Sequence, residues 1–124
     1  MRNRTLADSF RCAFAGLAHA FRTQRNLRLH LLAALVVLGL AAWLRVGGVA
    51  AAVLAGAVSL VIVTEIINTA LETVIDLVSP GFHPLAGLGK NLAAAAVVVA
   101  ALFAALVGTL ILGPPLWDRL AGGW

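Results

Sequence analysis

Three apolar runs, each long enough to cross a lipid bilayer, constrain this chain more than any other feature of its sequence. The runs cover residues 29–46, 49–68 and 90–112. A transmembrane helix needs about 20 consecutive, mostly apolar residues. Hydrophobic residues make up 62% of the chain and charged ones 11%, whereas a soluble domain carries about 25% charged residues. We therefore expect an all-α integral membrane protein, built as a single domain over 1–124.

Arginines are concentrated ahead of the first apolar run. Basic residues beside a span favour the cytoplasmic side, which predicts a cytoplasmic N-terminus and, after three spans, an outer C-terminus. We expect no nucleic-acid partner, because phosphate-binding basic segments rarely accompany three bilayer-length runs. The six arginines are Arg2, Arg4, Arg11, Arg22, Arg25 and Arg28.

Residues 8–26 are expected to form an amphipathic helix. Apolar residues recur on one helical face, and either Asp8 or Ser9 is expected to cap the N-terminus. With basic residues away from that face, such a helix lies along the membrane surface. The apolar stripe consists of Phe10, Phe14, Leu17 and Phe21.

The predicted second helix, 49–78, ends in an acidic stretch before Ser79-Pro80-Gly81. Glu65, Glu72 and Asp76 share one face there. Each residue of an α-helix turns the chain by roughly 100°, so residues seven and eleven positions after Glu65 point within about 20° of its direction. Near lipid, each carboxylate costs about 2.5 kcal/mol or more. A bound cation or a proton would relieve that cost. We interpret the face as a metal or proton site; a solvated helix face outside the membrane is the alternative.

The third predicted helix, 90–112, begins at Lys90 on the cytoplasmic side and stops before Gly113-Pro114-Pro115. A lysine beside free N-terminal N–H groups suits phosphate oxygens. Magnesium is held by one or two carboxylates together with nucleotide phosphates, and Glu65 is placed to accept a proton from a hydroxyl at headgroup level. These parts together describe phosphoryl transfer from a nucleotide to a lipid alcohol.

Four segments also carry a resemblance to a known family. They are Glu65-Ile-Ile-Asn68-Thr-Ala-Leu-Glu72-Thr-Val-Ile-Asp76, His83-Pro-Leu-Ala, Gly89-Lys90-Asn91-Leu-Ala-Ala-Ala, and Ser9-Phe10 through Arg28. The chain resembles, over nearly its whole length, the bacterial diacylglycerol kinase and undecaprenol kinase family. Asn68-Thr69-Ala70 and His83-Pro84-Leu85 are closer to the undecaprenol kinase branch.

The resemblance implies a homotrimeric lipid kinase of the bacterial inner membrane that uses Mg²⁺ and ATP. It implies a catalytic base at Glu65, an active-site amide at Asn68, and metal ligands at Glu72 and Gln24. It implies ATP contacts at Glu72, Gly81, Phe82, His83, Lys90 and Asn91. It implies lipid contacts at Asn26, Arg28, Trp43 and Glu65, with Asp76 in a supporting role.

Two positions depart from the family's pattern. Gln24 stands where the family often has a metal-binding glutamate, and it offers Mg²⁺ an oxygen without charge. Asn91 replaces an aspartate and cannot be an anionic partner for Lys90. A catalytically weakened member is therefore one alternative. A proton-coupled transporter is another, because an intramembrane glutamate is a usual proton carrier, and a non-catalytic assembly protein is a third. The sequence does not select the lipid acceptor.

Overall fold

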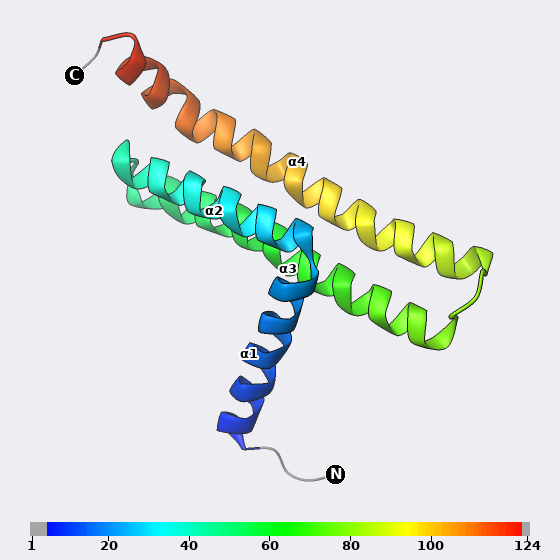
Figure 1. Ribbon diagram of the computed structural model, residues 1–124. Helices are drawn as coiled ribbons and strands as arrows, with labels where there is room; N and C mark the ends of the chain where they lie inside the picture. The colour runs from blue at the N-terminus through cyan, green and yellow to red at the C-terminus, as the bar shows by residue number, and fades with distance from the viewer. Residues whose placement is uncertain (1–4, 123–124) are drawn as a thin grey trace.

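The computed structural model describes residues 5–122, and these form four helices. The helices are α1 (Leu6–Thr23), α2 (Arg25–Trp43), α3 (Gly48–Val78) and α4 (Pro84–Leu120). The last three are each long and apolar enough to cross a membrane. They run side by side, while α1 leaves them at a steep angle (Figure 1). The prediction of an all-α fold with one N-terminal helix and three spans is confirmed.

Helix α1 is capped by Thr5, so the prediction that Asp8 or Ser9 caps it is wrong. The Asp8 N–H donates to Thr5 Oγ1 at 3.2 Å, and the Thr5 N–H donates to Asp8 Oδ2 at 3.2 Å. This reciprocal pair is a capping box, which places the acidic residue inside the first turn. The helix ends at Thr23, because Gln24 has an extended backbone with φ −108° and ψ 107°.

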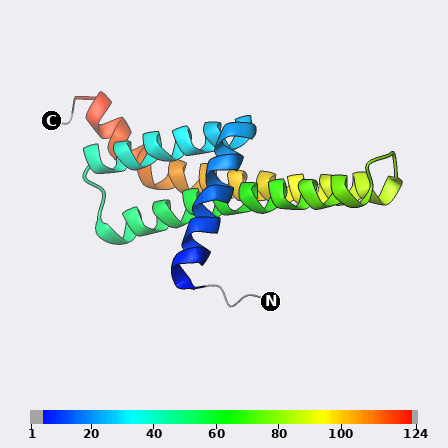
Figure 2. The same cartoon turned by 60° about the horizontal axis from the view of Figure 1, so that its bottom comes forward.

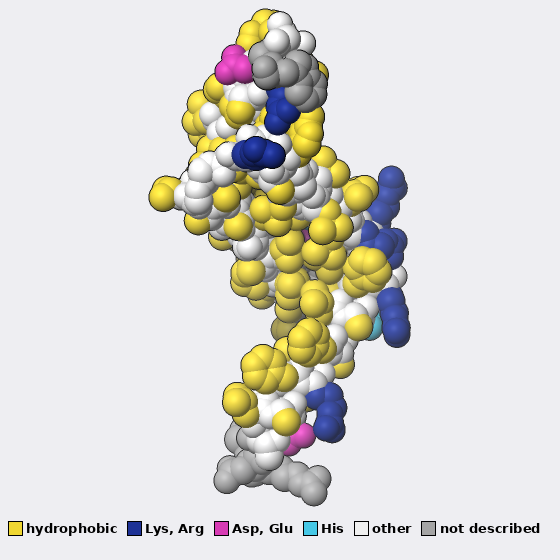
Figure 3. All heavy atoms as spheres, turned by 90° about the vertical axis from the view of Figure 1, so that its left-hand side faces the viewer, with side chains coloured by type: hydrophobic (Ala, Val, Ile, Leu, Met, Phe, Trp, Pro, Cys, Tyr) yellow, Lys and Arg dark blue, Asp and Glu magenta, His cyan; other side chains and the backbone are white. Residues whose placement is uncertain are grey.

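The side chains of α1 separate into an apolar and a basic side. Figure 3 shows α1 in the lower part of the view, with hydrophobic side chains along one edge and Lys or Arg side chains along the other. The phenylalanines of the predicted stripe are exposed, as are most large apolar side chains of the other helices. This apolar surface suits lipid rather than water.

Helix α2 begins and ends earlier than the expected span over 29–46. It starts at Arg25, directly after the extended Gln24, and ends at Trp43. The chain turns just beyond, where Arg45 has φ 54° in the left-handed region. A residue in this conformation is a common way to end a helix.

Helix α4 starts six residues before and ends eight residues after the expected third span, 90–112. Pro84 is its first residue. The backbone N–H at this position makes no hydrogen bond within a helix, so proline, which lacks an N–H, is tolerated there. The helix continues through Gly113-Pro114-Pro115, so the predicted stop there is wrong. The glycine has no Cβ to clash with the first proline ring, and helices in membranes tolerate such prolines.

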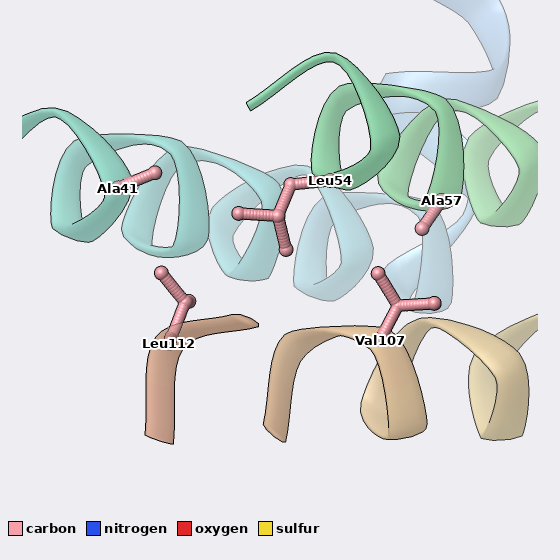
Figure 4. Close-up of a cluster of buried hydrophobic side chains, with 5 residues drawn as sticks. All are labelled: Ala41, Leu54, Ala57, Val107 and Leu112. Atoms are coloured by element: carbon pink, nitrogen blue, oxygen red, sulfur yellow. The ribbon is translucent and has the colours of Figure 1, made fainter. Parts of the chain in front are cut away.

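Helices α2, α3 and α4 pack most tightly near the α2–α3 turn. Figure 4 shows five small or medium apolar side chains meeting there from all three helices. They are Ala41, Leu54, Ala57, Val107 and Leu112. Small residues allow helices to approach closely in a bilayer. This end of the bundle is therefore closed by packing.

The opposite end is formed by α3 and α4 alone. At 1.5 Å per residue, the 31 residues of α3 and the 37 of α4 measure about 46 and 55 Å. Both exceed the hydrocarbon thickness of about 30 Å. Their hairpin extends well past the beginning of α2 (Figure 2). The acidic stretch lies in this extended half.

Candidate active site

A cavity of about 460 Å³ lies among α2, α3 and α4 where the hairpin begins to extend beyond α2. We call it the polar cavity. Three of its wall residues are polar side chains of α3 on one helical face, as the spacing predicted: Glu65, Asn68 and Glu72. The other walls are Asn26, Leu29 and His30 of α2, and Ala94, Val97, Val98 and Ala101 of α4.

Glu65 is the only charged residue among residues 5–122 that is buried, with 3% of its surface exposed. Its backbone carbonyl accepts a hydrogen bond from Thr69 Oγ1 at 3.0 Å. No described residue donates a hydrogen bond to its carboxylate. A buried carboxylate without a partner is unfavourable, so its position in the cavity wall points to a ligand that supplies a donor or a charge.

Asn68 and Glu72 form a linked pair one turn further along α3. Asn68 Nδ2 donates to Glu72 Oε1 at 3.4 Å. This bond turns the amide so that Asn68 Oδ1 remains free, and that oxygen is buried without a partner among the described residues. Because buried acceptors are normally satisfied, this one indicates a site for a donor or a cation.

Lys90 and Asp76 form an ion pair between α4 and α3, one turn beyond Glu72. The Asp76 carboxylate stabilises the ammonium directly, and the charge of Glu72 adds to this at longer range. The two helices approach closely here: a Cβ atom added to Gly89 of α4 would lie only 3.1 Å from Ile75 Cδ1 of α3. Sequence reasoning missed this pair and gave Asp76 only a supporting role.

The prediction that Lys90 starts the third helix is wrong. It lies six residues after Pro84, beyond the free N–H groups of the first turn. The charge of Glu72 nevertheless acts on its ammonium, alongside that of Asp76. Lys90 can therefore offer a charge to a phosphate near Glu72, without help from the helix N-terminus.

The predicted ATP-contact loop lies at the α3–α4 turn, outside the polar cavity. His83 caps α4, and its Nδ1 accepts the Leu85 N–H at 3.1 Å. Phe82 is 98% exposed. Gly81 and Asn91 do not line the cavity either. Lys90 pairs with Asp76, one turn beyond Glu72, and the loop lies at the turn between α3 and α4.

Two predicted lipid contacts have other partners. Arg28 Nη1 donates to the Phe21 and Arg22 carbonyls at 3.0 Å each, which satisfies the last turn of α1. Trp43 lies at the far end of α2, where the Arg119 guanidinium carbon is 5.0 Å from its ring centroid. Neither residue lines the polar cavity, whereas Asn26 does.

His30 is the cavity residue that sequence reasoning did not assign to the site. The sequence suggested only a membrane boundary, because His30 opens the first apolar run. In the structure it lines the polar cavity and also a second cavity of about 230 Å³ that lies deeper between the same helices. We call this second cavity the apolar groove. It is walled mainly by alanine and valine, and it shares His30 and Ala101 with the polar cavity.

The donor set fits Mg²⁺ bound together with a nucleotide better than a metal ion held by protein alone. Within residues 5–122, no three His, Cys, Asp or Glu side chains gather closely enough to hold an ion. Magnesium commonly uses one or two carboxylates and takes its remaining ligands from phosphates and water. Glu72, with Asn68 hydrogen-bonded to it, provides such a partial set. Gln24, the other predicted ligand, does not line the polar cavity.

Residues 11–112 match the family model described as prokaryotic diacylglycerol kinase. The chain belongs to this family. It is 47% identical over 112 residues to a diacylglycerol kinase of Synechocystis, covering 90% of this chain and 64% of that protein. A diacylglycerol kinase of Escherichia coli is 31% identical over 100 residues, covering 81% of this chain and 82% of that protein. An undecaprenol kinase of Bacillus subtilis is 33% identical over 108 residues, covering 87% and 88%.

These comparisons confirm the resemblance found in the sequence. The chain spans 64% of the length of the Synechocystis protein. Family membership does not favour the transporter alternative.

Proposed function

We propose that this chain is a lipid kinase that transfers the γ-phosphoryl group of ATP to the hydroxyl of a membrane lipid alcohol, undecaprenol or diacylglycerol. The observation that carries the proposal is Glu65, a buried residue whose carboxylate has no partner among residues 5–122, in the wall of a cavity that Glu72 also lines. A base at the membrane edge beside an anionic metal ligand is what phosphoryl transfer to a lipid requires. The kinase names of all three relatives agree with it.

On the nucleotide side, Glu72, with Asn68 hydrogen-bonded to it, would hold Mg²⁺, and Lys90 would bind phosphate oxygens. The bound ion would neutralise charge on the phosphates. Because Asp76 already pairs with Lys90, it holds the ammonium on the correct side of the hairpin before a nucleotide arrives. The loop at Gly81, Phe82 and His83 would contact the rest of the nucleotide.

On the lipid side, the depth of Glu65 along α3 matches the level at which the acceptor hydroxyl of a lipid is expected. Glu65 is 17 residues after Gly48, or about 26 Å along the helix, near the inner edge of a hydrocarbon layer of about 30 Å. A lipid hydroxyl lies at that level, with its chain in the apolar groove. Glu65 takes the hydroxyl proton as the new O–P bond forms and the P–O bond to ADP breaks.

We propose the remaining features from family membership and the charge pattern. They are a homotrimer in the bacterial cytoplasmic membrane, a cytoplasmic N-terminus, α1 along the membrane surface and a single lipid-kinase domain. The partial donor set at Glu72 is compatible with further ligands from a neighbouring subunit. The arginines ahead of the first span support the orientation.

The direct test is phosphate transfer by the purified chain. Radiolabelled ATP, excess Mg²⁺ and detergent micelles containing either undecaprenol or diacylglycerol should yield one labelled lipid product or both. The Glu65→Gln variant should yield none above background. Native protein that remains trimeric but labels neither lipid would rule the proposal out and favour the non-catalytic alternative.

A further inference from the structure

His30 occupies the junction between the polar cavity and the apolar groove. Among the described residues that line the groove, it alone has a polar side chain. The imidazole is half-buried and makes no hydrogen bond with any residue the structure describes. It lies 13 residues before Trp43, or about 20 Å along α2, at a depth occupied by hydrocarbon.

An unpaired polar group at this depth is unfavourable and is usually functional. Glu65 and Asn68 line the same polar cavity. The Glu65 carboxylate and Asn68 Oδ1 also lack partners among residues 5–122. His30 and Glu65 therefore contribute two polar side chains to the wall of one space, and the protein satisfies neither of them. A polar ligand group that enters the space from the membrane would explain both.

We propose that His30 binds the acceptor hydroxyl of the lipid and orients it for transfer; this rests on the proposed kinase function. An imidazole offers an N–H donor in either charge state. The hydroxyl oxygen has one hydrogen and two lone pairs. The hydrogen points to the Glu65 carboxylate, one lone pair accepts the His30 N–H, and the other lone pair attacks the γ-phosphorus.

The position of His30 also accounts for how the lipid chain is placed. A chain that leaves the polar cavity for the apolar groove must pass the side chains common to both, His30 and Ala101. Since lipid tails gain no hydrophobic energy on moving from bilayer to groove, the groove alone cannot fix the hydroxyl. A hydrogen bond from His30 supplies that directional contact.

The test compares two substitutions of His30. His30→Leu removes the donor at similar size, and His30→Gln keeps an N–H donor. We expect His30→Leu to lower kcat/KM for the lipid about tenfold, as for one lost hydrogen bond, without changing the KM for ATP. His30→Gln should recover most of the loss. His19→Leu removes an exposed imidazole outside both cavities and should leave both parameters unchanged.

Three outcomes would overturn the assignment. They are native lipid kcat/KM in His30→Leu, an equal loss in both His30 variants, and a change confined to the KM for ATP. If His30→Leu does not fold, ¹⁵N-histidine NMR of the native chain replaces it. Added lipid alcohol without nucleotide should shift one imidazole signal that is missing in His30→Gln, and no shift refutes the proposal. This binding measurement remains informative even if the native chain transfers no phosphate.

Discussion

Replacing Glu65 by glutamine should make the protein more stable while nearly abolishing its activity. Glu65 is 3% exposed, and its carboxylate has no hydrogen-bond donor among the described residues. Glutamine has nearly the same shape but carries no charge and is a poor base. The substitution therefore removes an unfavourable buried charge and the proposed proton acceptor in one step.

The size of the stability gain depends on how deep Glu65 lies in the bilayer. An ionised side chain at the centre of a bilayer costs about 2.5–3.5 kcal/mol on insertion scales. Glu65 is about 26 Å from Gly48, near the edge of a layer about 30 Å thick. Only part of that cost applies there, and the glutamine amide is itself unpartnered, so we expect a gain of about 1 kcal/mol in the free energy of unfolding. Loss of a general base should slow transfer by about 10²–10⁴-fold.

The stability assay is unfolding in mixed micelles by SDS titration, followed by circular dichroism, and the activity assay is lipid phosphorylation at saturating substrates. Glu72→Gln is the matched control. Glu72 lies about 36 Å from Gly48, is half-buried and accepts a hydrogen bond from Asn68. Its loss should reduce activity without stabilising the fold. The reasoning fails if Glu65→Gln keeps more than about a tenth of native activity, or if it unfolds more readily than native protein.

Three further predictions test the nucleotide, metal and lipid sides separately. Lys90→Met should raise the KM for ATP about tenfold or more at saturating lipid, and an unchanged value would remove Lys90 from the phosphate site. Gln24→Glu should lower the Mg²⁺ concentration for half-maximal activity, because a second carboxylate strengthens binding of a hard cation; an unaltered magnesium titration would show that residue 24 does not reach the ion. Ala101→Leu, where the two cavities meet, should raise the KM for lipid, whereas Ala95→Leu, exposed on the same helix and outside both cavities, should not. Equal effects of the two leucines would indicate a general disturbance of α4.

Helical periodicity was sufficient to predict the shared face of Glu65 and Glu72, because that face depends only on the geometry of one helix. The pairing of Asp76 with Lys90 depends instead on the register between two helices. An antiparallel hairpin brings Asp76 level with Lys90 and Glu72 level with Ala94 only if the turn is as short as the structure has it. A third helix that begins only at Lys90 implies a loop extending to Gly89, and with so long a loop the register between the two helices cannot be predicted.

His30 was missed for a similar reason. The sequence shows that a histidine opens an apolar run, but the direction of its side chain depends on how α2 packs against α3. The helix through Pro114 and Pro115 was missed because proline is a reliable helix stop in water. In α4 a preceding glycine relieves the clash and the bilayer favours continued helix. The Arg119 contact with Trp43 follows from that continuation.

The distribution of packing explains why an unsatisfied polar site can be maintained in this small protein. Near the α2–α3 turn the three spans are closed by small apolar side chains. Over their lengths, α3 and α4 make the most extensive contact, while α2 makes few contacts with α4. The polar cavity is lined by both of these loosely packed helices together with α3. Glu65 and Asn68 are held on α3, which packs along α4, and His30 lines the same cavity from α2.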